Sequence, residues 1–235
     1  MPATRERIFN LPKVTKGLIF ALTAAQFVVA YSPPEFAQWL LATFAFIPAR
    51  VTIEGGAEYA TMLTYFFFHG DWTHLVVNVL ALAAFGTPVE RRFGSGRYLL
   101  FLAASAFAGA LFFLALHPYE IAPVVGASGA ISGTMGAIVR FAFTPGARLA
   151  DGRRSSRAPY DEESGSTSLS QLPLNRQAMF FLIAWLAANL LLGAFPQAAG
   201  ASSAIAWEAH VGGFLFGLLS FSFFDSAGRR ALSSQ

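Results

Sequence analysis

The sequence has no cysteine and few charged residues for its length. Of its 235 residues only 12% are charged, whereas 55% are hydrophobic, and soluble domains typically have about a quarter charged residues. The absence of cysteine excludes thiol catalysis, disulfide bonds and cysteine-bound zinc, and it leaves the redox compartment open. The composition therefore predicts a membrane protein whose chemistry depends on hydroxyl, carboxylate and imidazole groups. The net charge of +3 does not predict a nucleic-acid partner, because the basic residues flank apolar segments instead of forming one patch.

Six apolar segments are candidates for membrane-spanning helices, which need roughly 20 residues each. They cover residues 17–31, 72–85, 98–116, 128–143, 178–195 and 208–224. The first segment is short and has a cleavable signal peptide as its alternative, but flanking apolar residues extend it. The fourth consists mainly of small residues, which predicts a helix packed inside the bundle. Residues 35–48 are aromatic but too short to cross, so we expect an interfacial element that dips into the membrane.

The basic residues predict how these segments are oriented. They precede the first segment, separate the second from the third and the fourth from the fifth, and follow the sixth, whereas only Arg50 falls in the other connections. With six crossings these groups share one side, which the positive-inside rule assigns to the cytoplasm. We expect an integral multi-pass protein of the cell (inner) membrane with both termini in the cytoplasm. Residues 1–16 and 226–235 are then cytoplasmic ends, residues 17–225 form the membrane domain, and the serine-rich residues 144–173 form a flexible cytoplasmic loop.

A serine set among small residues, in Gly126-Ala127-Ser128-Gly129, begins the fourth segment. The predicted topology puts Ser128, His210, His74 and Asn78 at one depth near the outer face. Glycines in the fourth and sixth segments allow close helix approach, so that Ser128 and His210 can meet. His210 would then act as general base toward the serine hydroxyl and return the proton to a leaving amine. A motif for packing helices is the alternative explanation of this serine.

His74 and Asn78 suit the stabilisation of negative charge. They are four residues apart and share one face of a helix, for which Asp71 is the expected N-cap. The His74 ring, the Asn78 amide and the Ser128 backbone N–H can donate hydrogen bonds to the oxyanion of an attacked peptide carbonyl. Hydrogen bonding between helices is the alternative role. On a helix Glu208 points about 200° away from the side chain two residues later, so we expect a Ser–His dyad without a carboxylate.

A metal site formed by His69, His74 and Asp71 is a further alternative. Histidines five residues apart do not share a helix face as those of a His-Glu-x-x-His site do, so we expect neither a metal nor a cofactor. His69 is predicted to be structural, and His117 to lie in a loop without a catalytic role.

Together these residues resemble the rhomboid family of intramembrane serine proteases. The resemblance rests on Phe46-Ile47-Pro48-Ala49-Arg50-Val51-Thr52, His69-x4-His74-x3-Asn78, Gly94-x-Gly96-Arg97-Tyr98, Gly126-Ala127-Ser128-Gly129 and Ala209-His210-Val211-Gly212-Gly213. It implies an all-α bundle of six transmembrane helices with a membrane-dipping first external loop, and a Ser128/His210 dyad. It also implies an oxyanion site from His74, Asn78 and the Ser128 amide, with supporting roles for His69, Gly126, Gly129 and Gly213. The implied partners are the lipid bilayer and membrane proteins with single transmembrane helices, which are cut near the outer face.

Two positions depart from the family pattern. Ser132 stands where some members have an aromatic residue that stacks on the catalytic histidine, and Glu208 is an acid where an uncharged residue is expected. The hypothesis from sequence is a serine-type endopeptidase that hydrolyses peptide bonds in or near transmembrane segments. Its alternatives are a non-proteolytic rhomboid-like protein that binds transmembrane helices, against which the intact dyad argues, and a transporter, for which no inverted repeat is visible.

Overall fold

The computed structural model describes residues 11–143, 166–195 and 206–225, and within these ranges the chain is built from helices. The one pairing of extended backbone there is an isolated antiparallel bridge between Phe46 and Val124. The all-helical class predicted from the sequence is thereby confirmed for the described part of the chain. The C-terminal end, residues 1–10 of the N-terminal end and most of the flexible loop expected from the sequence lie outside the described residues, whereas residues 13–16 of the expected N-terminal end belong to α1.

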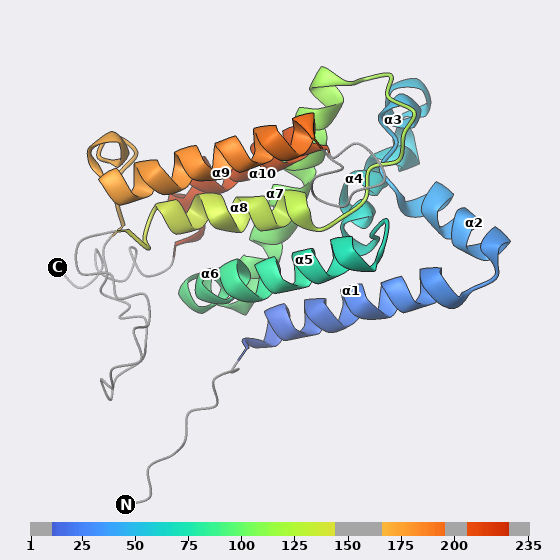
Figure 1. Cartoon of the computed structure of the whole chain (residues 1–235), viewed down its shortest axis with the longest axis horizontal. Coiled ribbons are helices and arrows are strands. Elements are labelled where there is room, and N and C mark those ends of the chain that lie inside the picture. The colour runs from blue at the N-terminus through green and yellow to red at the C-terminus, as the bar shows by residue number, and fades with distance from the viewer. Residues whose placement is uncertain (1–10, 144–165, 196–205, 226–235) are drawn as a thin grey trace, which may run out of the picture.

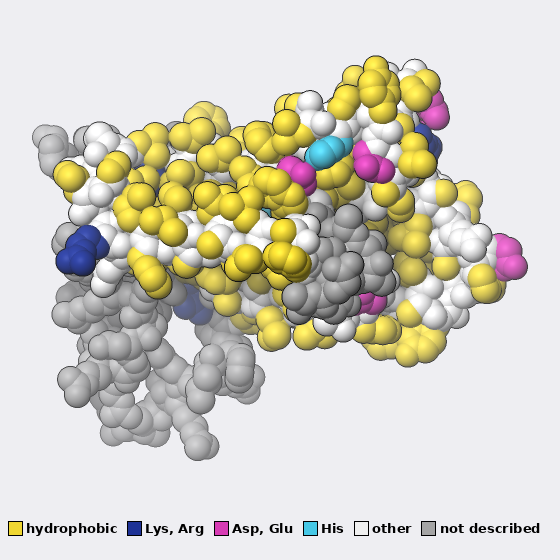
Figure 2. Space-filling model, turned by 45° about the horizontal axis from the view of Figure 1, so that its top comes forward, with side chains coloured by type: hydrophobic (Ala, Val, Ile, Leu, Met, Phe, Trp, Pro, Cys, Tyr) yellow, Lys and Arg dark blue, Asp and Glu magenta, His cyan; other side chains and the backbone are white. Residues whose placement is uncertain are grey.

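Four helical stretches among the described residues are long and apolar enough to cross a membrane. They are α1 (Lys13–Tyr31), the continuous stretch Trp72–Phe93, α7 (Ser95–Leu116) and α9 (Arg176–Ala194). The stretch Trp72–Phe93 comprises α5 (Trp72–Ala81), the π-helical turn η3 (Leu82–Gly86) and α6 (Thr87–Phe93). Many large hydrophobic side chains of the described residues are exposed, and hydrophobic side chains spread over the face seen in Figure 2, as expected for a protein surrounded by lipid. The chain is therefore an integral membrane protein.

Short helices connect α1 to α5 and lie together at one end of the bundle (Figure 1). They are α2 (Pro34–Phe44), α3 (Pro48–Glu54), η1 (Gly56–Ala60), α4 (Thr61–Thr64) and η2 (Tyr65–Phe67). The element expected over residues 35–48 corresponds to α2, which ends at Phe44, four residues earlier than predicted. Pro48 begins α3 instead of ending the preceding helix. None of the side chains of α2 is buried, so this helix stands apart from the core.

The centre of the bundle is α8 (Ser128–Val139), which runs alongside α10 (Trp207–Phe224). Ten of its twelve residues are buried, as expected for the segment of small residues. A Cβ carbon at Gly213 would collide with the carbonyl oxygen of Gly129, and one at Gly217 with that of Gly133. Glycines on both helices therefore allow the two backbones to approach closely.

Glu90 of α6 fixes the beginning of α1. Its buried carboxylate accepts hydrogen bonds from the backbone N–H groups of Val14 (2.9 Å) and Thr15 (2.7 Å), the Thr15 hydroxyl (2.8 Å) and the Ser95 hydroxyl (2.8 Å). The first N–H groups of a helix lack intrahelical partners and carry partial positive charge. Glu90 therefore caps α1 and ties this helix to α6 and α7.

Replacing Glu90 with alanine is expected to destabilise the protein. The substitution leaves two backbone N–H groups and two hydroxyls without their acceptor, so we expect the free energy of unfolding to fall by about 2–4 kcal/mol. Unfolding of the purified protein in mixed micelles measures this difference. Glu35→Ala, at an exposed acid of α2, is the control, and equal stability of the two variants would contradict the capping role.

Candidate active site

Ser128 and His210, the two residues that the sequence analysis singled out as a dyad, lie at hydrogen-bond distance. Ser128 Oγ is 2.7 Å from His210 Nε2. Ser128 is the first residue of α8, and His210 lies in the first turn of α10. A Cβ carbon at Gly129 would lie only 2.8 Å from the Tyr65 hydroxyl and 3.5 Å from the Ala209 carbonyl oxygen. The small residues beside Ser128 thus allow the starts of the two helices to meet, and the separation permits direct proton transfer.

Sequence reasoning missed a third side chain at this site, Asn189 of α9. Its Oδ1 is 2.7 Å from His210 Nδ1, and its Nδ2 donates to the Trp185 carbonyl oxygen at 2.9 Å. Asn189 is only 7% exposed, although most of α9 faces outward. The available signal was an amide in the middle of an apolar segment, which is costly in lipid unless it has a partner.

His74 approaches the same hydroxyl across Gly126. The backbone of Gly126 has a φ of 123°, a conformation that residues with a side chain rarely adopt. A Cβ carbon at this position would lie 2.8 Å from both Cε1 and Nε2 of His74 and 3.6 Å from Ser128 Oγ. The N–H of Gly126 donates to the Tyr65 carbonyl oxygen at 3.0 Å, and this hydrogen bond fixes the segment that precedes α8. Gly126 therefore keeps open the space between the imidazole and the hydroxyl.

The start of α5 determines where His74 and Asn78 lie. The Asp71 carboxylate accepts from the His74 backbone N–H at 2.7 Å, which confirms the predicted N-cap. Asn78 is buried, and its Nδ2 donates to the His74 carbonyl oxygen at 2.9 Å. An amide nitrogen carries two N–H groups, so one remains available to a ligand. The Oδ1 atom of Asn78 has no partner among the described residues.

His69 packs against His74 and makes no polar contact with described residues. The two rings meet edge to face with centroids 5.0 Å apart, and His69 is 1% exposed. Burial, followed by the proximity of His74, lowers the pKa of His69 to about 3, although Asp71 opposes this change. The ring is therefore neutral, which suits packing behind His74.

The acid that the sequence places near His210 is engaged elsewhere. Glu208 Oε1 lies 2.9 Å from Nε2 of His117, at the end of α7.

Ser132 is buried within α8. Some rhomboids have an aromatic side chain at this position, whereas this chain has a serine. In the described part of the chain no three acidic or histidine side chains gather as a metal site, which leaves the metal alternative without a ligand set there.

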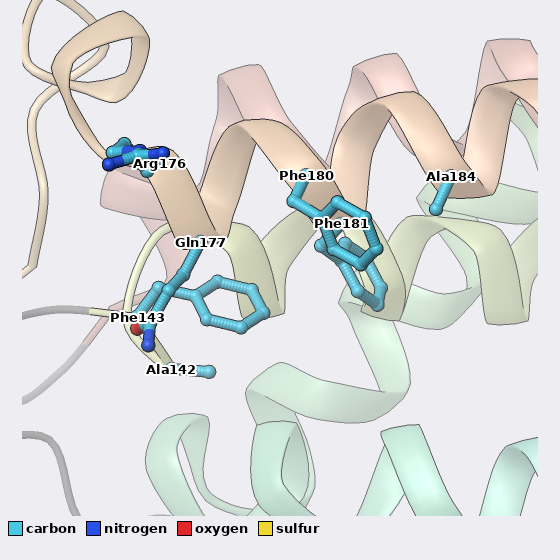
Figure 3. Close-up of a pocket in the computed structure, with 7 residues that line it drawn as sticks. All are labelled: Ala142, Phe143, Arg176, Gln177, Phe180, Phe181 and Ala184. Atoms are coloured by element: carbon cyan, nitrogen blue, oxygen red, sulfur yellow. The ribbon is translucent and has the colours of Figure 1, made fainter.

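A pocket of about 590 Å³ lies between residues that follow α8 and the first turns of α9 (Figure 3), and neither Ser128 nor His210 lines it. It is lined by Ala142, Phe143, Arg176, Gln177, Phe180, Phe181 and Ala184. Because this lining includes no histidine, acid or hydroxyl group, the pocket contributes no acid–base or nucleophilic chemistry.

The fold and the site define a helical membrane protein with a serine–histidine pair where two helices begin. A family model, the Rhomboid domain, matches residues 56–225, which is well over half of the chain. The chain therefore belongs to the rhomboid family.

Three relatives show the extent of this similarity. The rhomboid protease GluP of Bacillus subtilis is 41% identical over 87 residues, which cover 37% of this chain and 17% of that protein. The putative rhomboid protease YdcA of the same organism is 34% identical over 79 residues, which cover 34% of this chain and 39% of that protein. The mitochondrial Rhomboid protein 1 of Saccharomyces cerevisiae is 28% identical over 131 residues, which cover 52% of this chain and 35% of that protein. The chain thus spans less than half the length of each of these relatives.

Proposed function

We propose that this protein is an intramembrane serine endopeptidase that hydrolyses peptide bonds in or near transmembrane segments of other membrane proteins. The observation that carries the proposal is the 2.7 Å contact between Ser128 Oγ and His210 Nε2. Relatives named as rhomboid proteases support the reaction class. A serine hydroxyl is a weak nucleophile until a base removes its proton, and a neutral imidazole at this distance is such a base.

The proposed reaction has two halves. Ser128 Oγ attacks the substrate carbonyl carbon while His210 Nε2 takes the hydroxyl proton, and the tetrahedral intermediate collapses as His210 returns that proton to the leaving amine. Water then attacks the acyl-enzyme while His210 takes its proton, and the second intermediate collapses as His210 gives that proton to Ser128 Oγ, which releases the new carboxyl end and restores the hydroxyl. In both halves the oxyanion accepts hydrogen bonds from the Ser128 backbone N–H, the His74 ring and the free N–H of Asn78.

The proposed topology has six crossings: α1, the α5–α6 stretch, α7, α8, α9 and α10. The clustering of Lys and Arg residues on one side of such an arrangement supports cytoplasmic termini. Residues 17–225 would then be the membrane domain, with the site near the outer face. Substrates reach a nucleophile there from the bilayer, so we infer that they are transmembrane helices that unwind locally before cleavage.

A panel of labelled transmembrane peptides, incubated with the detergent-solubilised protein, tests this function. We expect the unmodified protein to cleave at least one peptide, and the Ser128→Ala variant to cleave none. Equal cleavage by the two proteins would contradict the proposed nucleophile. Binding without cleavage by the unmodified protein would instead favour a non-proteolytic role.

Asn78→Ala is expected to lower kcat by about 10²- to 10³-fold with little change in KM, because the lost donor acts mainly on the transition state. Initial rates over a range of peptide concentrations separate the two constants. Gln177→Ala removes an exposed amide in the first turn of α9 and is the matched control. If Asn78→Ala had the kcat of this control, Asn78 would not serve the oxyanion.

A further inference from the structure

We propose that Asn189 is a positioning residue that holds His210 in the tautomer able to accept the Ser128 proton, and that it makes the dyad sensitive to the position of α9. The inference rests on the proposed function, because it assigns a role to a residue that acts through His210. Its physical basis is a chain of three hydrogen bonds that runs from the backbone of α9 to the nucleophile.

The amide of Asn189 has one orientation that suits both of its neighbours. Nδ2 donates to the carbonyl oxygen of Trp185, one turn earlier on α9, at 2.9 Å. A flipped amide would put Oδ1 against that carbonyl oxygen, and two acceptors would then face each other. Oδ1 therefore faces Nδ1 of His210 at 2.7 Å. The backbone of α9 thus determines that the oxygen of the amide, and not its nitrogen, faces His210.

This polarity selects one tautomer of neutral His210. A carbonyl oxygen can only accept a hydrogen bond, so the ring proton lies on Nδ1. Nε2 then directs its lone pair at the Ser128 hydroxyl, 2.7 Å away. The other tautomer would direct an N–H at Ser128 and leave the ring unable to take the serine proton. A neutral amide thereby performs the orienting task that a carboxylate performs in a Ser-His-Asp triad.

Asn189 belongs to a helix that is loosely held by the bundle. The buried residues of α9 are Ala178 and Asn189 alone. Near the site, α9 contacts α10 through the Asn189–His210 hydrogen bond and through the rings of Trp185 and Phe214, which stack with centroids 4.0 Å apart. A further contact lies at Gly193, where a Cβ carbon would collide with the Trp207 ring. By contrast, α8 and α10 are joined along their length by backbone contacts at glycines. A shift of α9 away from α10 would therefore release His210 while the α8–α10 pair stayed intact.

The test combines substitutions at Asn189 with two readouts. Asn189→Leu keeps the approximate size of the side chain and removes the acceptor, whereas Asn189→Asp keeps an acceptor. Leu190→Ala, at a neighbouring side chain that is 46% exposed, is the control. One readout is kcat and KM for a cleavable transmembrane peptide. The other is the ¹⁵N NMR spectrum of histidine-labelled protein, which distinguishes the two tautomers and requires no activity.

We expect Asn189→Leu to lower kcat by about 10- to 10³-fold, which is less than the ~10⁴-fold loss caused by a wrong tautomer in a triad. KM should change little, and Asn189→Asp should recover most of kcat. In the unmodified protein the His210 signal should show a proton on Nδ1 and none on Nε2, and Asn189→Leu should populate both tautomers. An unchanged kcat in Asn189→Leu, or an Asn189→Asp variant as impaired as Asn189→Leu, would overturn the proposal.

Trp185→Ala tests the dependence on α9, since it removes the ring stack and leaves the Asn189 side chain in place. We expect a lower kcat and a mixture of His210 tautomers, and a normal kcat with a single His210 tautomer would overturn this part of the proposal.

Failure of the proposed protease function can be distinguished from failure of the role proposed for Asn189. An unmodified protein that cleaves no peptide would refute the protease assignment, while the NMR comparison would still decide what Asn189 does to His210.

Discussion

Replacing His210 with alanine is expected to reduce peptide cleavage by at least about 10²- to 10⁴-fold, the range that general acid–base catalysis contributes. His210 Nε2 is the base nearest to the nucleophile, 2.7 Å from Ser128 Oγ. It acts in both halves of the proposed reaction, so its loss affects acylation as well as hydrolysis of the acyl-enzyme. Steady-state cleavage of a labelled transmembrane peptide, at equal concentrations of folded protein, measures the loss.

The control for this variant is His117→Ala. His117 also lies at the end of a long helix, but its ring contacts Glu208 and not Ser128. We expect His117→Ala to cleave at a rate close to that of the unmodified protein. A His210→Ala variant that retained a tenth or more of the activity would remove His210 from the mechanism.

Gly126→Ala is the second substitution with a large expected effect, a loss of at least about 10²-fold in kcat, comparable to the removal of an oxyanion donor. The φ of 123° strains any residue with a Cβ carbon. That carbon would also lie 2.8 Å from two ring atoms of His74, closer than van der Waals contact allows, and beside Ser128 Oγ. Either the His74 ring or the chain before α8 must move, and both moves disturb the proposed oxyanion site.

Gly96→Ala provides the matched control for this change. A Cβ carbon at Gly96, in the first turn of α7, would meet nothing within 4 Å. We expect the Gly96→Ala variant to retain normal kcat and KM. Normal catalysis by Gly126→Ala would show that the space between His74 and Ser128 has no role in the reaction.

The pairing of Ser128 with His210 could be anticipated because two independent patterns agree. The distribution of basic residues predicts that Ser128 and His210 lie at the same depth in the membrane. Glycines on α8 and α10 predict that the two helices pack closely. The structure has the two atoms 2.7 Å apart. The N-cap at Asp71 was predictable for a similar reason, since capping depends on neighbours in the sequence.

Asn189 could not be assigned from the sequence, because its role depends on how α9 lies against α10. Helical periodicity gives the direction of a side chain but not the helix that it meets. The same limit applies to Glu208. The periodicity correctly turns this acid away from His210, but its partner His117 belongs to another helix. Glu90 is a third case, since the cap that it provides for α1 comes from 75 residues away in the chain.

Helix ends were less predictable than helix positions. The first segment is predicted over residues 17–31 with flanking apolar residues that extend it, and α1 begins at Lys13, where Glu90 supplies an acceptor to its first turn. The fourth segment was expected to reach residue 143, but α8 ends at Val139. The residues that follow form a turn in which Arg140 donates to backbone oxygens of Leu218 and Thr167. Contacts from distant parts of the chain, which no local pattern encodes, decide both ends.

The most direct test of the central claim, that His210 activates Ser128, is the site and rate of labelling by a serine-reactive fluorophosphonate. Mass spectrometry of the digested protein locates the adduct, and a time course gives its rate of formation. The account predicts one adduct, on Ser128, that forms much more slowly in His210→Ala and at a normal rate in His117→Ala. An adduct on another serine, or undiminished labelling of Ser128 in His210→Ala, would contradict it.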